Sequence, residues 1–154
     1  MINKKIRIDS IKILEVDKAS VGILKSMKKL LPQLTTNYKS FDQNNLEEIV
    51  KSEATRLFVA HDLTSNKEIV GTYTMVIFRI PTGNIMRIED VIVDEERRGE
   101  GIGKKLMIHA IDYAKKSAVT KIELSSHPSR VAANKLYRSL DFQRIETNVY
   151  RYMI

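Results

Sequence analysis

A short segment rich in glycine and basic residues has the clearest chemistry in this sequence. Two arginines, Arg97 and Arg98, precede three glycines at alternate positions, Gly99, Gly101 and Gly103. An apolar strand is expected before this segment and an amphipathic helix after it. That order places free backbone N–H groups, a helix N-terminus and fixed cations at one point, which is how proteins bind a diphosphate. Glycine lets the backbone approach the phosphates closely, so the segment predicts a phosphate-binding loop.

Two familiar phosphate loops do not fit the spacing of these glycines. A dinucleotide fingerprint, G-x-G-x-x-G/A, would need glycine or alanine where the chain has Lys104 or Leu106. A P-loop fails because Gly99 and Gly103 are one residue too close, and because Lys105 stands where its hydroxyl residue should be. What remains is the run from Arg98 to Gly103, which has the pattern [QR]-x-x-G-x-[GA].

This run closely resembles motif A of the GNAT superfamily of N-acetyltransferases, whose loop and following helix hold the pyrophosphate of acetyl-coenzyme A (acetyl-CoA). A second segment, residues 133–142, resembles the family's A-x-x-L-Y-x-x-x-G-F signature. Two positions depart from the family pattern. Asp141 replaces a glycine that ends a helix in a left-handed turn, a conformation that aspartate tolerates better than most residues. Arg130 replaces an asparagine of many relatives and could alter a cofactor contact or add a cation near the adenosine phosphate.

The resemblance implies an acetyl-CoA site built from two segments. Backbone N–H groups of residues 98–104 would bind the phosphates, with added charge from Arg98 and Lys104, whereas Arg97 and Lys105 are expected to be solvated. A backbone N–H at the end of the preceding strand would donate to the oxyanion of the tetrahedral intermediate. The predicted cofactor-binding residues are Val91, Ile92, Val93, Arg98, Gly99, Glu100, Gly101, Ile102, Gly103, Lys104, Asn134 and Tyr137.

Three side chains are candidates for proton transfer when a thioester acylates an amine. An alkyl amine with a pKa of about 10.4 must lose a proton first, which costs roughly 4–5 kcal/mol at pH 7, so a general base contributes. Glu89 and Asp90 are the candidates, and Glu89 is favoured because family members often place an acid on this strand. The two would point to opposite faces unless a bulge intervenes. An ion pair with Arg87 or Arg79 is the structural alternative. The resemblance makes Tyr137 the proton donor to the thiolate.

Composition argues against several other classes of function. The chain has 154 residues, 43% of them hydrophobic and 29% charged, as expected for a single domain spanning residues 1–154. No apolar run approaches the ~18 residues of a membrane span, and no signal peptide is recognisable, so a cytoplasmic protein is expected. Cysteine is absent and the histidines show no metal spacing, so no metal is predicted. The net charge of +7 is scattered except at the loop, which argues against a nucleic-acid partner.

Hydrophobic periodicity predicts an α/β fold with a mixed sheet. Strands are expected at residues 6–16, 57–61, 69–80, 85–93, 121–125 and 143–154, and helices at 20–31, 42–51, 101–117 and 130–140. This is the order of the GNAT acyltransferase fold, a mostly antiparallel sheet in which two parallel strands splay apart around the pantetheine arm. Strands 85–93 and 121–125 would be that parallel pair. Segment 31–41 would line the acceptor site, and strand 143–154 is a candidate to pair across a homodimer.

The sequence therefore predicts an N-acetyltransferase that moves an acetyl group from acetyl-CoA directly to a primary amine of a small molecule or peptide. Another acyl donor in the same pocket is one alternative. A catalytically weak acyl-CoA-binding sensor or interaction module is a second, and a basic nucleic-acid-binding protein is a third. The acceptor itself is not specified, because the acceptor site of this family is built from variable loops.

Overall fold

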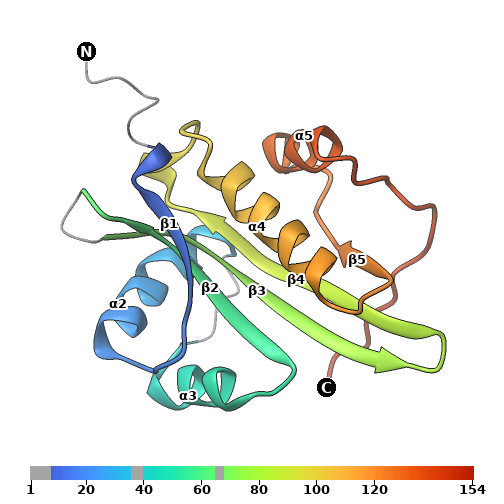
Figure 1. Cartoon of the computed structure of the whole chain (residues 1–154), viewed down its shortest axis with the longest axis horizontal. Helices are drawn as coiled ribbons and strands as arrows, with labels where there is room; N and C mark the ends of the chain where they lie inside the picture. Colours follow the sequence, from blue (N-terminus) through green and yellow to red (C-terminus); the bar gives the residue numbers. More distant parts are fainter. Residues whose placement is uncertain (1–7, 36–39, 65–67) are drawn as a thin grey trace.

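The computed structural model describes residues 8–35, 40–64 and 68–154 and contains a five-stranded sheet in the order β1-β2-β3-β4-β5 (Figure 1). The strands are β1 (Ile11–Glu15), β2 (Thr55–Asp62), β3 (Glu68–Ile80), β4 (Gly83–Val93) and β5 (Lys121–Leu124). The helices are α2 (Val21–Leu30), α3 (Gln43–Lys51), α4 (Ile102–Lys116) and α5 (Val131–Ser139), with short 3₁₀ turns η1 (Leu31–Gln33) and η2 (Glu95–Arg97). Neighbouring strands are antiparallel except β4 and β5, which are parallel as predicted. The mixed α/β fold class is confirmed.

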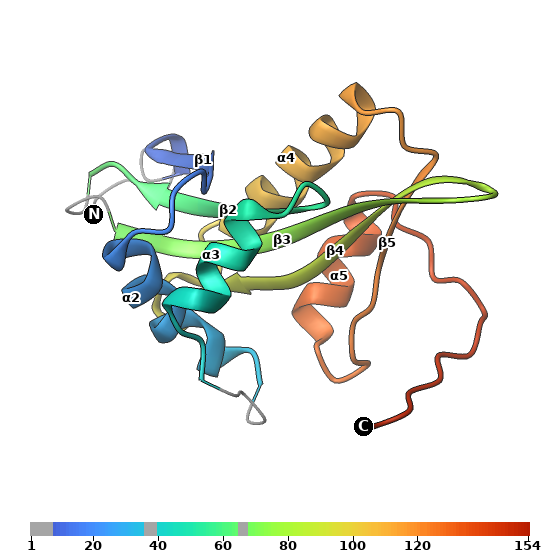
Figure 2. The same ribbon diagram turned by 90° about the horizontal axis from the view of Figure 1, so that it is seen from below.

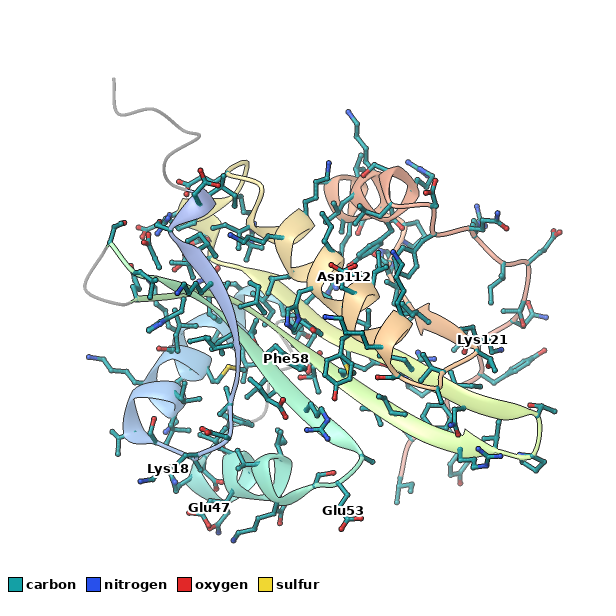
Figure 3. All side chains as sticks on the ribbon, viewed as in Figure 1. Lys18, Glu47, Glu53, Phe58, Asp112 and Lys121 are labelled. Atoms are coloured by element: carbon teal, nitrogen blue, oxygen red, sulfur yellow. The ribbon has the colours of Figure 1, made fainter. Side chains whose placement is uncertain are left out.

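Helices cover both faces of the sheet (Figures 1 and 2). On one face, Leu106 of α4 packs with Phe58 of β2 in a buried cluster, and Leu136 of α5 packs against the same cluster. Phe58 lies in the interior of the molecule (Figure 3), where its ring stacks on Tyr73 with the ring centroids 5.0 Å apart. On the other face, α2 and α3 form a second cluster that contains Leu46. Full burial of a leucine side chain stabilises the fold by about 1.5–3 kcal/mol.

Local sequence signals set the ends of α2 and α3. The Ser20 side chain accepts a hydrogen bond from the backbone N–H of Ile23 at 3.3 Å, which caps α2. Asp42 caps α3 as predicted, and its side chain and that of Asn45 each accept a backbone N–H of the other residue at 2.9 Å. This reciprocal pair is a capping box. The two caps fix where the helices start and therefore which of their faces pack on the sheet.

A bulge interrupts β4 at Asp90. Glu89 pairs with Thr74 of β3, but the next pair is Ile92 with Thr72, so β4 contains one extra residue. The extra residue lets Asp90 adopt a φ of 49°, in the left-handed region that non-glycine residues seldom occupy. The bulge also changes which residues face α4. Before it the residue that packs toward α4 is Ile88, and after it that residue is Val91.

Gly71 lets β3, β4 and α4 pack closely together. A Cβ atom at this position would lie 2.9 Å from the backbone oxygen of Ile92, which is closer than real Cβ contacts. It would also lie 3.3 Å from the side chain of Leu106 and 3.4 Å from that of Ile102. At residue 71, β3 therefore approaches the backbone of β4 more closely than a side chain permits, and the α4 side chains leave little spare room beside it.

Two predicted strands differ from the structure. β1 begins at Ile11 because residues 8–10 form a short helical turn, and residues 1–7 lie outside the described residues. The predicted strand at 143–154 is wrong, since this segment is irregular chain that lies away from the sheet (Figure 2). Its alternating side chains are exposed, with Val149 80% and Tyr152 92% exposed. Alternation produces a strand only where a neighbouring strand edge pairs with it, and none of the five strands does so. Residues 36–39 of the predicted acceptor segment also lie outside the described residues.

Candidate active site

A cavity of about 690 Å³ lies where the C-terminal end of β4, the N-terminus of α4 and the start of α5 meet. It is lined by Gln33, Leu34, Val91, Ile92, Val93, Arg97, Arg98, Gly99, Gly101, Ile102, Gly103, Lys104, Ser129, Arg130, Val131, Ala132, Ala133, Leu136 and Tyr137. All the predicted cofactor-binding residues except Glu100 and Asn134 are in this set. The structure thus brings the two motifs, which are about thirty residues apart in the sequence, to one cavity.

The glycine loop has the backbone geometry that a phosphate site needs. Gly99 and Gly101 have φ values of 81° and 84°, a region that side chains disfavour. Gly103 lies in the first turn of α4, where a Cβ atom would be 3.3 Å from the side chain of Leu136. The first backbone N–H groups of α4 have no acceptor within the helix, and the helix dipole adds partial positive charge there. This arrangement fits a phosphate group at the helix N-terminus.

Two of the basic residues near the loop are paired rather than solvated. Arg97 is only 8% exposed, and its Nη2 and Nε atoms each donate a hydrogen bond at 2.9 Å, to Asp62 and Glu100 respectively. Lys105 donates to the backbone oxygen of Ile8 at 2.8 Å. The expectation that Arg97 and Lys105 are solvated is therefore wrong. Sequence spacing cannot reveal these contacts, because Asp62 and Ile8 lie on distant segments.

Arg98 and Lys104, the predicted sources of added charge, both line the cavity. The Nε of Arg98 donates to the backbone oxygen of Val93 at 3.3 Å, which ties this side chain to the end of β4. Together with the N-terminus of α4, the two side chains make this end of the cavity electropositive. An anionic group is the chemistry that this end of the cavity suits.

The two adjacent acids have different surroundings. Glu89 forms an ion pair with Arg87, whose Nη2 also donates to Ser125 at 3.2 Å. Asp90 occupies the bulge directly before Val91, which lines the cavity. Partial desolvation of its carboxyl and the neighbouring charge of Glu89 raise the pKa of Asp90, and the Arg130 cation partly opposes this rise. The ion pair expected as the structural alternative is thus present at Glu89, while Asp90 has the perturbed pKa.

Tyr137 lines the cavity and packs edge-on against Phe142, with the ring centroids 6.1 Å apart. Burial raises the pKa of the Tyr137 hydroxyl, and the positive charge of Arg130 opposes this rise. The phenol therefore keeps its proton at neutral pH and can donate it. Arg130 thus influences the pKa of Tyr137 and of Asp90, which places its charge near both candidate proton-transfer groups.

Asn134 and Glu100 have side-chain partners within the protein. The Asn134 side chain donates to the backbone oxygens of His127 and Arg130, both at 2.9 Å. It thereby holds the turn that precedes α5. Glu100 accepts the hydrogen bond from Arg97. The prediction that these two residues contact the cofactor stays a prediction.

The cavity wall includes the start of segment 31–41, which was predicted to line the acceptor site. Gln33 ends η1 and Leu34 follows it directly. The Gln33 side chain accepts from the backbone N–H of Glu95 at 2.9 Å, and Arg130 donates to the backbone oxygen of Leu34 at 3.0 Å. These bonds connect η1 to the loop and to α5. Arg130 was expected from the family pattern to alter a cofactor contact or to add a cation near the adenosine phosphate, but its bond to segment 31–41 was not foreseen.

Within residues 8–35, 40–64 and 68–154, no group of three or more His, Cys, Asp and Glu side chains is arranged to hold a metal ion. The histidines serve separately: His109 Nδ1 hydrogen-bonds the Tyr73 hydroxyl at 2.8 Å, and His127 Nδ1 lies 2.7 Å from the Ser129 hydroxyl. No helix in the same described ranges has the length and apolar character to cross a membrane.

Comparisons with known sequences identify a family and relatives. Residues 24–142 match the model of the Acetyltransferase (GNAT) family. The chain is 29% identical over 106 residues to the uncharacterized N-acetyltransferase YhdJ of Bacillus subtilis, a match covering 69% of this chain and 73% of that protein. It is 35% identical over 68 residues to N-acetylaspartate synthetase of Danio rerio, covering 44% of this chain but only 24% of the length of that protein.

Solved structures share the fold. An aminoglycoside acetyltransferase from an uncultured soil metagenomic sample, in complex with sisomicin, superposes with a TM-score of 0.81 at 19% identity and covers 95% of this chain and 97% of its own. Glucosamine-6-phosphate N-acetyltransferase from Arabidopsis thaliana superposes with a TM-score of 0.73 at 24% identity and covers 94% of this chain and 99% of its own. At these identities the likeness extends to the fold alone.

Proposed function

The chain belongs to the acetyltransferase (GNAT) family of enzymes, and we propose that it transfers the acetyl group of acetyl-CoA directly to a primary amine of a small molecule or peptide. One observation carries this proposal. A single cavity joins a phosphate loop, at the N-terminus of α4, to a tyrosine on α5 and to the end of β4 beyond the bulge. A thioester that is attached to a phosphate-bearing arm would reach from one end to the other.

The donor would bind by its phosphates at the loop and by its arm between β4 and β5. Pairing between these strands runs only from Ile85 with Lys121 to Ile88 with Leu124. Beyond that point β4 continues into the bulge and then along the cavity wall. A backbone N–H of residues 91–93 would donate to the thioester oxygen as it becomes negatively charged.

In the reaction, the amine nitrogen attacks the thioester carbonyl carbon, a C–N bond forms and the C–S bond breaks. The amine must first lose its ammonium proton. We assign Asp90 as the base that accepts this proton, because the raised pKa of its carboxyl is closer to the pKa that suits a general base at neutral pH. Glu89, the residue favoured from sequence, is the alternative base and would have to act while paired with Arg87. Tyr137 would donate its proton to the departing thiolate, and the proton that the nitrogen loses as the tetrahedral intermediate collapses to the amide would return to the Tyr137 phenolate.

The proposed acceptor is an amine. The names of the known relatives do not specify the rest of its structure. One structural relative was solved in complex with sisomicin, another is named for glucosamine 6-phosphate, and one sequence relative is named for N-acetylaspartate. Because these amines differ in charge and size, a mixed panel is the appropriate screen. It should contain amino acids, amino sugars, aminoglycosides, polyamines and peptides.

The test begins with a calorimetric titration of the purified protein with acetyl-CoA. We expect one-to-one binding that is lost in Gly101→Val, since a β-branched residue does not tolerate a φ of 84° at the loop. The amine panel is then screened for thiol release. Binding without release for any amine would favour the sensor alternative. No binding at millimolar acetyl-CoA, together with steeply salt-dependent binding to random duplex DNA, would favour the nucleic-acid alternative.

A further inference from the structure

A buried ion-pair network adjoins the phosphate loop. Asp62, at the end of β2, is fully buried and accepts hydrogen bonds from the Ser10 hydroxyl at 3.2 Å and from the backbone and hydroxyl of Thr64 at 2.9 and 2.7 Å. Its other carboxylate oxygen accepts from Arg97 at 2.9 Å. Arg97 in turn donates to Glu100, which lies between two glycines of the loop. The end of β2 and the glycine loop therefore meet at one guanidinium group.

Asp62 is held in its ionised form. Burial alone would favour the protonated acid, but hydrogen bonds from Thr64, Arg97 and Ser10 keep the pKa of Asp62 well below its usual range. A buried charge of this kind is tolerated only when its partners stay in place. The carboxylate therefore restrains Arg97, and through it Glu100.

The loop also has anchors on its other flank. Asp94, which begins η2, forms an ion pair with Lys29 of α2 at 2.7 Å. The next residue, Glu95, donates its backbone N–H to Gln33 at 2.9 Å. These contacts hold the chain before Arg97. Gly99, which follows soon after, has less support, because a Cβ atom there would meet nothing within 4 Å.

Glycine loses more conformational freedom on ordering than any other residue, so a glycine loop that must order on binding weakens affinity. We propose that Asp62 is a positioning residue, which acts through Arg97 and Glu100 to keep residues 97–101 in the conformation that receives the pyrophosphate. The inference rests on the proposed function, because it assumes that the loop binds coenzyme A (CoA). Asp62 itself would not touch the ligand.

A role in positioning differs measurably from a role in stability alone. If Asp62 only stabilises the fold, Asp62→Asn lowers the melting temperature but the folded protein binds CoA with unchanged affinity. If Asp62 positions the loop, the folded variant binds CoA more weakly. Pantetheine, which lacks the pyrophosphate, would contact the strands and not the loop, so its affinity should not change.

The experiment compares dissociation constants for CoA, by calorimetry at a temperature where each variant is folded. We expect Asp62→Asn to bind CoA at least tenfold more weakly than wild type, and its dissociation constant for pantetheine, by NMR titration, to be unchanged. The double variant Asp62→Asn/Arg97→Gln should bind CoA little more weakly than either single variant. Both substitutions break the same chain of contacts from Asp62 through Arg97 to Glu100. Arg56→Met is the matched control. It removes the 2.6 Å ion pair with Glu15 at the β1–β2 edge and should leave CoA binding intact.

Glu100→Gln provides a second variant, in case Asp62→Asn does not fold. It leaves the buried Asp62–Arg97 pair in place and should also weaken CoA binding without affecting pantetheine. Equal CoA affinity in wild type and in these variants would overturn this inference and leave the proposed function intact. Parallel losses for CoA and pantetheine would also overturn it. Absence of CoA binding by wild type would overturn the proposed function and, with it, this inference.

Discussion

Replacing Asp90 by glycine should make the protein more stable and less active. The φ of 49° at Asp90 lies in the left-handed region, where residues other than glycine cost about 1–2 kcal/mol and aspartate, which tolerates this region better than most, costs about 1 kcal/mol. Replacing aspartate by glycine also lowers the stability by roughly 0.5–1 kcal/mol, because the unfolded chain becomes more flexible. The Asp90 side chain is exposed, so its removal leaves no cavity. The net gain is at most about 0.5 kcal/mol, or ~1–2 °C in melting temperature for a chain of this size.

Thermal and guanidinium denaturation measure the stability, and thiol release with an amine from the screen measures turnover. Asp141→Gly is the matched control, because Asp141 is the other described non-glycine residue with positive φ, at 64°, and it lies after α5. It should gain similar stability with no loss of turnover. Asp90→Asn separates the carboxylate from the backbone, since asparagine tolerates the same φ without the charge.

Two results would refute separate parts of this prediction, one the effect on stability and the other the effect on activity. A fall in stability for Asp90→Gly, alongside a rise for Asp141→Gly, would mean that the Asp90 carboxylate stabilises the bulge by more than its backbone strain costs. Full turnover in both Asp90→Gly and Asp90→Asn would remove Asp90 as the general base and return that role to Glu89.

Three further outcomes are expected. Tyr137→Phe should lower kcat at least tenfold and leave the dissociation constant for CoA nearly unchanged, and unaltered kcat would exclude Tyr137 as the proton donor. Glu89→Gln, which breaks an exposed ion pair with Arg87, should cost under ~1 kcal/mol of stability and lower kcat less than Asp90→Asn does, as steady-state kinetics would report. Burial would raise the pKa values of Asp62 and Asp94, but their hydrogen bonds and ion pairs outweigh it and lower both pKa values. These two carboxylates therefore stabilise the fold above the pKa of 3.8 that aspartate has in the unfolded chain, and this stabilisation is lost as the pH falls below 3.8. Urea unfolding of wild type and Asp62→Asn should therefore converge at low pH, and a constant difference would contradict the assignment.

The sequence predicts local features of this protein better than its long-range contacts. The glycine loop, the start of α4 and the Asp42 cap depend on neighbouring residues, so their patterns are visible in the chain. The parallel pairing of β4 with β5 was also predictable, because a helix connects them. The left-handed turn expected at Asp141 is present for the same reason, as a short helix ends there.

Other features depend on partners that the sequence does not identify. The bulge at Asp90 follows from how β4 pairs with β3, and the adjacent acids Glu89 and Asp90 do not by themselves show that the strand contains an extra residue. Arg97 was expected in solvent because its partner Asp62 is 35 residues away. Residues 143–154 have the alternation of a strand and no strand beside them. In each case the sequence pattern described the segment itself, but it did not show which distant segment lies beside it.

The close packing at Gly71 has a consequence for the size of the ligand. The phosphate loop belongs to α4, whereas the reacting end of the cavity belongs to β4 and α5. The depth at which α4 packs on the sheet therefore fixes the separation between the two ends. A methyl group at residue 71 would lie 2.9 Å from the backbone oxygen of Ile92, so the end of β4 that lines the cavity would have to move relative to β3 and α4. If the proposed donor binds here, the distance between its phosphates and its thioester carbon would thus depend on the absence of a side chain at residue 71, which does not line the cavity.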